Sequence, residues 1–281
     1  MTLPRRQMLI GGAALTGVLM QRPARAQGPD LSISGRMVQG GHAIGQTWPG
    51  AEILVDGERL TAASAEGLFI VGFDRDALPR VRIEARDGSR SAETVLALAP
   101  GSFVTSRIDG LPQSTVTPED PELLARIQRE VAIKSQAYAS RADGAHFRNG
   151  FDWPLEDIRV SSPWGGQRVL NGTPARPHFG VDLAAPAGTP IRAPAAGLVT
   201  LAQPDMHFEG GLVLIDHGQG LISAYLHQSR LDVREGQTVE RGAVIGAVGA
   251  TGRATGPHLC WRLRWRDRNL DPSLLVRTAE S

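Results

Sequence analysis

Residues 258–265 decide the fold of this chain, and they read His-Leu-Cys-Trp-Arg-Leu-Arg-Trp. Large apolar side chains alternate with polar ones at all eight positions, which is the two-residue period of a β-strand with one face in a core. The polar set begins with His258 and includes Cys260, the only cysteine of the chain. The stretch therefore predicts a strand that turns its tryptophans to the core and presents a histidine and a cysteine on the other face.

The sequence around this stretch has the same character from Trp153 onward. Short apolar segments are joined by glycine-containing turns, which predicts a compact antiparallel β-domain. The expected strands are 197–201, 211–216, 220–227, 243–248 and 258–265.

Two further segments of this region carry polar side chains at alternating positions. If residues 178–183 are extended, His178 and Asp182 share one face with Gly180, and the residues between them face the core. In the same way Ser223, Tyr225 and His227 are expected to share the polar face of the strand 220–227. We expect Ile222, Ala224 and Leu226 to pack inward.

These residue types suit a catalytic zinc site. Zinc binds neutral imidazole, carboxylate and thiolate, and a catalytic site uses three protein ligands and one open position. His178, Asp182 and Cys260 could supply the ligands, and His227 and His258 could act as a base and as a stabiliser of negative charge. The alternative is scattered surface histidines and a cysteine that packs as a small apolar residue. Its alternation with the tryptophans places Cys260 away from the core and weakens that alternative.

Three motifs resemble those of a known family, the LytM/lysostaphin-type zinc metallopeptidases (peptidase family M23). They are His178-x-x-x-Asp182, Tyr225-Leu226-His227 and Gly256-Pro257-His258-Leu259-Cys260, and the similarity runs in family order from about residue 153 to 275. The resemblance implies a mainly β fold of the LytM-like, duplicated hybrid type with a groove, one Zn²⁺ ion and cleavage of peptide bonds in peptidoglycan. It also implies that His178 and Asp182 bind zinc and that His227 and His258 are catalytic histidines outside the ligand set.

Cys260 departs from the family pattern, because the third zinc ligand of the family is the second histidine of a His-x-His motif. We expect Cys260 to be the third zinc ligand in place of that histidine, since thiolate is also a good zinc ligand. The expected function is a zinc-dependent endopeptidase that hydrolyses peptide cross-links of bacterial peptidoglycan, whose stem peptides are then the main partner. One alternative is a catalytically inactive LytM-like regulator or a wall-binding protein that activates another wall hydrolase. The other is a purely structural β-protein.

The first 26 residues read as an export signal. Arg5 and Arg6 precede an apolar stretch from Met8 to Met20, and a small-x-small cleavage pattern ends at Ala26. The paired arginines resemble a twin-arginine signal, and a general secretory signal or an uncleaved anchor is the alternative. The apolar stretch is too short for a stable membrane span. We therefore expect an exported protein of the periplasm or cell envelope.

Between the signal and the predicted peptidase domain, two further units are expected. Residues 27–100 contain short alternating segments between glycine turns, which predicts a small β-sandwich. Residues 101–150 read as a linker with a helix over 118–139, capped by Thr117, and residues 151–281 form the metallopeptidase domain. His42 is expected to be a surface residue of the sandwich, and His217 is expected to shape a turn.

Composition narrows the classes of function further. The net charge is +1, and the first 26 residues hold four arginines and no acid, so the rest of the chain is slightly acidic. A nucleic-acid-binding protein would need a basic surplus, so no nucleic acid is expected as a partner. A single cysteine excludes an intramolecular disulfide.

Overall fold

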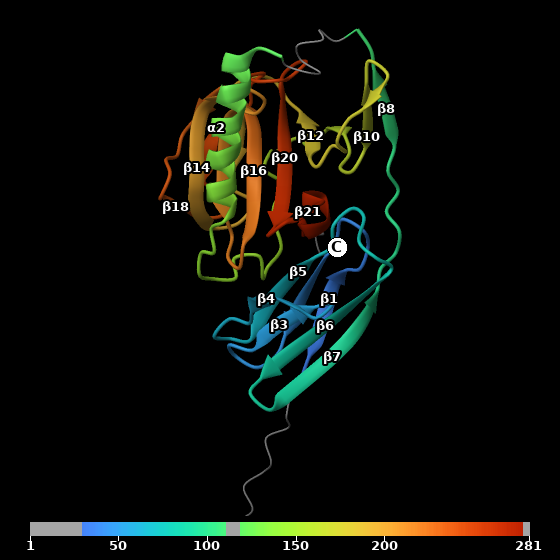
Figure 1. The fold of residues 1–281 in the computed structure, drawn as a ribbon. Helices are drawn as coiled ribbons and strands as arrows, with labels where there is room; N and C mark the ends of the chain where they lie inside the picture. The colour runs from blue at the N-terminus through green and yellow to red at the C-terminus, as the bar shows by residue number, and fades with distance from the viewer. Residues whose placement is uncertain (1–29, 111–118, 278–281) are drawn as a thin grey trace, which may run out of the picture.

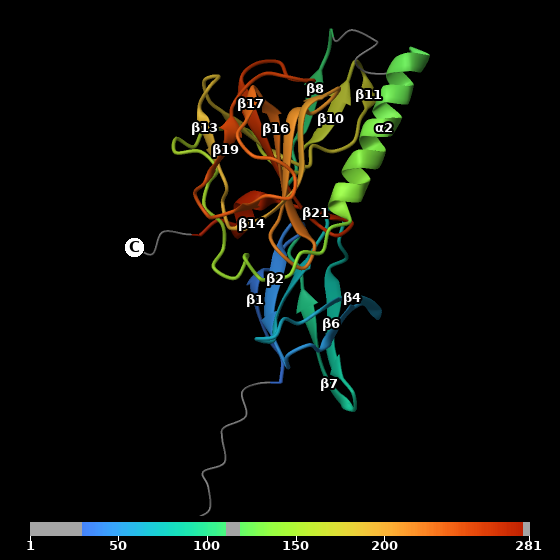
Figure 2. The same cartoon turned by 90° about the vertical axis from the view of Figure 1, so that its left-hand side faces the viewer.

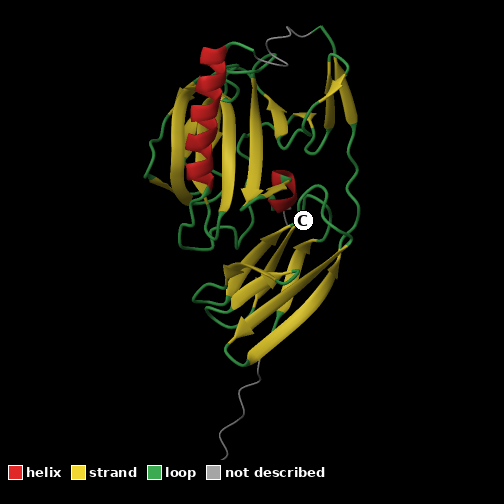
Figure 3. Cartoon of the chain, viewed as in Figure 1, coloured by secondary structure: helices red, strands yellow, loops and turns green. Residues whose placement is uncertain are grey.

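The structure is a computed structural model that describes residues 30–110 and 119–277. The expected export signal lies outside the described residues, as do Thr117 and Pro118 at the expected start of the helix. The described chain is mainly β, as predicted, with a single long helix in its described part (Figure 3). No helix among the described residues is long and apolar enough to cross a membrane.

The N-terminal region forms two antiparallel sheets that pack against each other. One sheet has the order β1-β2-β5 and consists of β1 (Ser32–Arg36), β2 (His42–Gln46) and β5 (Leu68–Gly72). The other has the order β4-β3-β6-β7 and consists of β3 (Glu52–Val55), β4 (Glu58–Ala62), β6 (Arg80–Asp87) and β7 (Arg90–Ala97). Phe69, Ile53 and Ile83 are fully buried in the core that includes both sheets, because alternate residues of each strand face inward.

The C-terminal region is built on one large antiparallel sheet with the order β18-β14-β15-β16-β20-β12-β9, and β21 pairs with β20. Its strands are β9 (Val160–Ser162), β12 (Val181–Ala184), β14 (Gly197–Met206), β15 (Gly210–Asp216), β16 (Leu221–Gln228), β18 (Thr238–Val239), β20 (His258–Trp265) and β21 (Arg268–Leu270). The strands expected over 197–201, 211–216, 220–227 and 258–265 all belong to this sheet.

Two small sheets and a short 3-10 helix complete the region. One small sheet has the order β13-β19-β17 and consists of β13 (Pro190–Arg192), β17 (Arg230–Leu231) and β19 (Val244–Ala247). The other has the order β11-β10-β8 and consists of β8 (Thr105–Ile108), β10 (Gln167–Leu170) and β11 (Thr173–Pro174). Since β8 pairs in parallel with β10, part of the expected linker is a strand beside the metallopeptidase region (Figure 1). The 3-10 helix η1 covers Pro272–Leu275.

The large sheet is buried on both faces. Trp261 and Trp265 face the main core, as the alternation in the sequence predicts. The opposite face holds a second apolar cluster that includes Leu214, Leu226 and Cys260. Helix α2 (Pro121–Tyr138) lies over this face and contributes Ala137 and Tyr138 to the cluster (Figures 1 and 2). Cys260 therefore faces away from the tryptophans, as predicted, but it is only 1% exposed.

The helix begins later than the sequence pattern predicts. Its N-cap is Asp120, whose side chain accepts a hydrogen bond from the backbone N–H of Glu122, and Pro121 occupies the first helical position. The sequence predicts the same arrangement, a capping side chain followed by proline, at Thr117 and Pro118. In the structure Asp120 and Pro121, three residues later, provide it.

The sandwich packs directly onto the end of the large sheet that carries β21. A Cβ atom added at Gly72 of β5 would lie 2.8 Å from Leu270 of β21, and Phe73 belongs to the same buried cluster as Trp265. The side chain of Gln219 also bonds the backbone of β5 at two positions. The sandwich and the large sheet thus share one continuous core.

Candidate metal centre and its histidines

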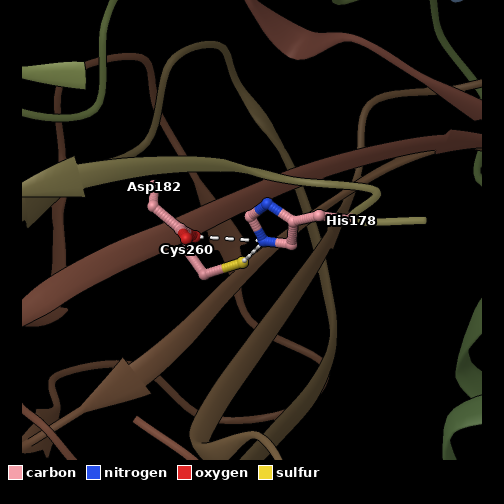
Figure 4. Close-up of side chains that lie close together, drawn as sticks. All are labelled: His178, Asp182 and Cys260. Carbon is pink, nitrogen blue, oxygen red and sulfur yellow. Dashed lines mark hydrogen bonds and ion pairs between the residues drawn. The ribbon is translucent and has the colours of Figure 1, made fainter. Parts of the chain in front are cut away.

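Two neighbouring strands bring the three expected zinc ligands together. Asp182 on β12 is directly opposite Cys260 on β20, and His178 lies just before β12. His178 Nε2 is 3.2 Å from Asp182 Oδ1 and 3.4 Å from Cys260 Sγ. One ligand atom from each of the three residues lies within 4.8 Å of the other two (Figure 4). This arrangement has the donor types and the spacing that a zinc ion requires.

Two details show that these residues fit a metal ion. Asp182 Oδ1 is buried and, although His178 Nε2 lies 3.2 Å away, it makes no well-aligned hydrogen bond among the described residues, which is costly for a buried carboxylate oxygen. A Cβ atom at Gly180 would lie 2.7 Å from Cys260 Sγ and 3.3 Å from His178 Nε2, so glycine keeps the space beside the donors open.

Each of the three residues also has a partner that holds it in place. The Ser162 hydroxyl is 3.4 Å from His178 Nδ1, on the side of the ring away from the other two donors. Arg168 donates to Asp182 Oδ2, which leaves Oδ1 for a metal ion. The Arg262 Nε group donates to Cys260 Sγ over 3.4 Å. Such outer partners orient metal ligands and tune their donor strength.

Burial and the neighbouring charges set the protonation of the three residues. Burial lowers the pKa of His178, so its imidazole is neutral, as a metal ligand must be. Burial alone would raise the pKa of Asp182, but the neighbouring His178 and, to a smaller extent, His258 and Cys260 outweigh it and hold the pKa below its usual value. Burial raises the pKa of the Cys260 thiol to about 12, with Arg262 acting in the opposite direction.

A β-bulge places His227 beside this cluster. Val213 pairs with Tyr225 and Gly211 pairs with Gln228, so the two residues 226 and 227 of β16 lie opposite a single residue of β15. His227 takes a left-handed backbone conformation with φ of 65°. A bulge of this kind turns a side chain toward the other face of a sheet.

The expected polar face of β16 is therefore wrong for two of its three residues. Tyr225 pairs with Trp261 and lies in the main core, whereas Leu226 pairs with Cys260 on the helix-covered face. Ser223 is likewise fully buried, two residues from Tyr225, and bonds its hydroxyl. Simple alternation would have carried His227 into the main core as well. The bulge alone brings it to the ligand cluster.

His227 and His258 lie side by side, with ring centroids 4.8 Å apart. The Nδ1 atom of each ring is 2.8 Å from a backbone carbonyl oxygen, of Thr251 for His227 and of Gly256 for His258. A carbonyl oxygen can only accept, so Nδ1 carries a proton in both rings. Burial lowers the pKa of His227 to about 4, and its ring is therefore neutral near pH 7. His258 Nε2 is 3.8 Å from Asp182 Oδ1.

The five expected site residues line one cavity of about 220 Å³. Sequence reasoning did not assign a site role to several other residues of its wall, among them Arg168, Arg253 and Glu209. Arg168 comes from β10, and Glu209 precedes β15, so only the folded chain brings them to the ligands. Arg262 was visible in the sequence as the next residue on the Cys260 face, but that pattern does not reveal the bond to sulfur.

Two histidines outside the site are buried, and for His42 this corrects the expectation of a surface position. His42 on β2 is 7% exposed and is not a surface residue. His217 is completely buried beyond the end of β15, where its ring bonds the Ser223 hydroxyl. Both side chains belong to the packing of the fold, and neither lines the cavity described above.

Comparison with known proteins bears directly on this cluster. The profile of peptidase family M23 matches residues 176–272, a range that contains all five site residues. The DD-carboxypeptidase/endopeptidase Mpg of Neisseria meningitidis serogroup B is 41% identical over 128 residues, which are 45% of this chain and 29% of that protein. The peptidoglycan DD-endopeptidase ShyA of Vibrio cholerae serotype O1 is 40% identical over 111 residues, 39% of this chain and 26% of that protein. The chain thus spans less than a third of the length of these curated relatives.

A solved structure is similar over nearly the whole chain. It is the crystal structure of a candidate peptidase M23 from Pseudomonas aeruginosa, with 34% sequence identity and a TM-score of 0.66. The match covers 86% of this chain and 95% of that one, so it includes the N-terminal sheets as well as the large sheet. On the evidence of this match and of the ligand cluster, the chain belongs to peptidase family M23.

Proposed function

We propose that this protein is a zinc-dependent endopeptidase that hydrolyses peptide cross-links of bacterial peptidoglycan. The observation that carries the proposal is the convergence of His178, Asp182 and Cys260 beside two further histidines in one cavity. In this proposal the three residues bind Zn²⁺. The ion would supply a Lewis acid that polarises the peptide carbonyl and lowers the pKa of water.

His227 and His258 would move the protons of the reaction. His227 presents a neutral Nε2 lone pair, since its Nδ1–H is held by the Thr251 carbonyl. It can therefore accept a proton from the attacking water and return one to the leaving amine. His258 is fixed in the same way by Gly256 and would stabilise negative charge on the carbonyl oxygen.

The surroundings of the cavity suit an anionic, extended peptide. The cavity opens into a groove of about 760 Å³ between α2 and the strands β10 and β11. Six basic residues and two acidic ones line this groove: Lys134, Arg168, Arg176, Arg253, Arg262, Arg264, Glu209 and Asp267. Peptidoglycan stem peptides carry free carboxylates, which a groove with this charge attracts.

The groove continues to the sandwich. A further cavity of about 610 Å³ shares Arg176, Phe179 and Asn269 with the groove and is also lined by Asp74 and Leu78 of the sandwich region. We infer that a polymeric substrate can extend beyond the metal centre along this path. Both curated relatives described above are named for peptidase activities, and ShyA is named for peptidoglycan itself.

We also propose that the protein works outside the cytoplasm, in the periplasm or cell envelope, where its substrate lies. The charged, apolar and small-x-small pattern of residues 1–26 supports export. Stem peptides would be the principal partner, and another wall hydrolase would be the second.

The deciding experiment combines zinc analysis with product analysis of digested peptidoglycan. The full-length protein should contain one equivalent of zinc and release soluble muropeptides whose cross-links are cut. Removal of zinc with a chelator should stop release, and added zinc should restore it. A protein that binds no zinc and releases nothing, yet stimulates a second wall hydrolase, would instead be the inactive regulator.

A further inference from the structure

We propose that Arg262 is a positioning residue for the metal centre, and that it is the feature that allows a cysteine to serve as the third ligand. The inference rests on the proposed zinc site. Cys260 and Arg262 are two residues apart on the same face of β20, and the Arg262 Nε–H group donates to Cys260 Sγ over 3.4 Å. The guanidinium group thereby supplies both a hydrogen bond and a positive charge to the sulfur ligand.

The charges of the site explain why both contributions matter. A zinc ion bound by one carboxylate and two neutral imidazoles keeps one net positive charge. Exchange of one imidazole for a thiolate removes that charge. The guanidinium of Arg262, in contact with the sulfur, restores it. Cys260 together with Arg262 therefore carries the same total charge as one neutral histidine ligand.

The Arg262 side chain lies inside the site, beside the expected zinc ligands. It lines the small cavity together with His178 and Asp182. Its Cγ atom would lie 3.0 Å from a Cβ atom at Gly180, which also approaches the sulfur, so the side chain passes close to the donors. A partly buried guanidinium needs a counter-charge to be stable, and the thiolate of Cys260 in a zinc-bound site would supply it.

The neighbouring arginine on the same strand face has a different role. Arg264 lies over the ring of Tyr138, with its guanidinium carbon 4.9 Å from the ring centroid. It lines the groove but not the small cavity that contains the ligands. Arg264 is thus a matched control for Arg262, since both are arginines on β20 that lie on the helix-covered face.

The test is the zinc affinity of the full-length protein, measured by competition with a chromophoric chelator. Loss of an outer partner of a metal ligand lowers metal affinity by about 10- to 100-fold. We expect a loss of this size for Arg262→Met, which keeps an unbranched apolar stem, and no such loss for Arg264→Met. Arg262→Lys keeps the charge but lacks the planar donor group, so its affinity should lie between those of the parent and Arg262→Met.

Cobalt substitution provides a readout that a merely structural role would not change. The thiolate-to-cobalt charge-transfer band should shift when the hydrogen bond to sulfur is lost in Arg262→Met. It should stay in place in Arg264→Met. If Arg262→Met does not fold, the same comparison is made with Arg262→Lys.

A double-mutant cycle separates this inference from the proposed zinc site. In a Cys260→His background the sulfur is absent, so Arg262→Met should no longer weaken zinc binding. An equal loss in both backgrounds, or an unchanged affinity and cobalt spectrum in the parent background, would overturn the role of Arg262 while leaving the zinc site intact. A parent protein that binds neither zinc nor cobalt would refute the zinc site and, with it, this inference.

Discussion

His217 makes the stability of this protein sensitive to mildly acidic pH. The ring is completely buried, and its Nδ1–H donates to the Ala196 carbonyl over 2.8 Å. Its Nε2 atom accepts from the Ser223 hydroxyl at 2.7 Å, and the Ser223 oxygen lies 2.8 Å from the Tyr225 hydroxyl. Protonation of Nε2 would force the Ser223 hydroxyl to reverse its bond to the ring and would place an unpaired charge in the core. Burial accordingly lowers the pKa of His217 from 6.5 to about 4.

The size of the effect follows from the two pKa values. Because the folded-state pKa lies below the unfolded one, the unfolded chain binds the proton more readily, and stability is lost as the pH falls from about 6.5 toward 4. The loss in free energy of unfolding from this one residue is about 2 kcal/mol at pH 5 and about 3 kcal/mol below pH 4. Burial also lowers the pKa of His42 to about 4, so His42 acts with the same sign.

Urea unfolding of the chelator-treated protein between pH 7 and pH 4.5 measures this effect without a contribution from metal binding. The free energy of unfolding of the parent should fall steeply below pH 6.5. His217→Asn should be less stable at pH 7, because it disturbs the bonded network, but its stability should depend less on pH. The difference between the two slopes isolates His217 from the carboxylates. Parallel pH profiles for the parent and His217→Asn would refute the reasoning.

Three further predictions concern the site and export. His227→Ala and His258→Ala should each lower wall hydrolysis by about 10²- to 10⁴-fold and keep zinc, because neither histidine is assigned as a ligand. Zinc analysis beside a turnover assay checks this, and loss of zinc from His258→Ala would show that His258 is a ligand. Gly180→Ala should lose most bound zinc, because its added carbon would lie 2.7 Å from the cysteine sulfur, whereas Gly166→Ala adds a carbon no closer than 3.4 Å to its neighbours and should retain zinc on metal analysis. N-terminal sequencing of exported protein should find Gln27 first, and an intact Met1 start outside the cytoplasm would contradict cleavage there.

The strands and their core-facing sides were predictable wherever apolar and polar residues alternate without interruption along the strand. The stretch 258–265 alternates without exception, and the structure turns its tryptophans to the core as expected. The sequence did not reveal that α2 would bury the second face of the sheet. Nothing in the period of β20 shows what covers its polar side, because that depends on where a separate segment packs. For the same reason Cys260 is more deeply buried than its arginine neighbours suggest.

The gathering of the site residues was predictable from motif spacing, but the way His227 reaches the site was not. His178, Asp182 and Cys260 come together because β12 pairs with β20 in the register that their alternation requires. His227 depends on an extra residue in β16, and a bulge depends on the register between two strands. Alternation alone assigns Ser223 and Tyr225 to the site face, which the structure shows to be wrong.

The energetic cost of the site favours an enzyme over an inactive regulator. Asp182 presents a buried oxygen that makes no well-aligned hydrogen bond, and Arg262 is a partly buried cation whose contact is a sulfur. Each would destabilise the fold if no cation ever completed the site, because buried charged groups are costly unless they are fully paired. A regulator without metal would be more stable with apolar or small polar residues at these positions. Zinc at the His178, Asp182 and Cys260 donors would satisfy the orphaned oxygen and convert the thiol into the anion that Arg262 pairs with. The arrangement therefore suits a chain that binds metal better than one that does not.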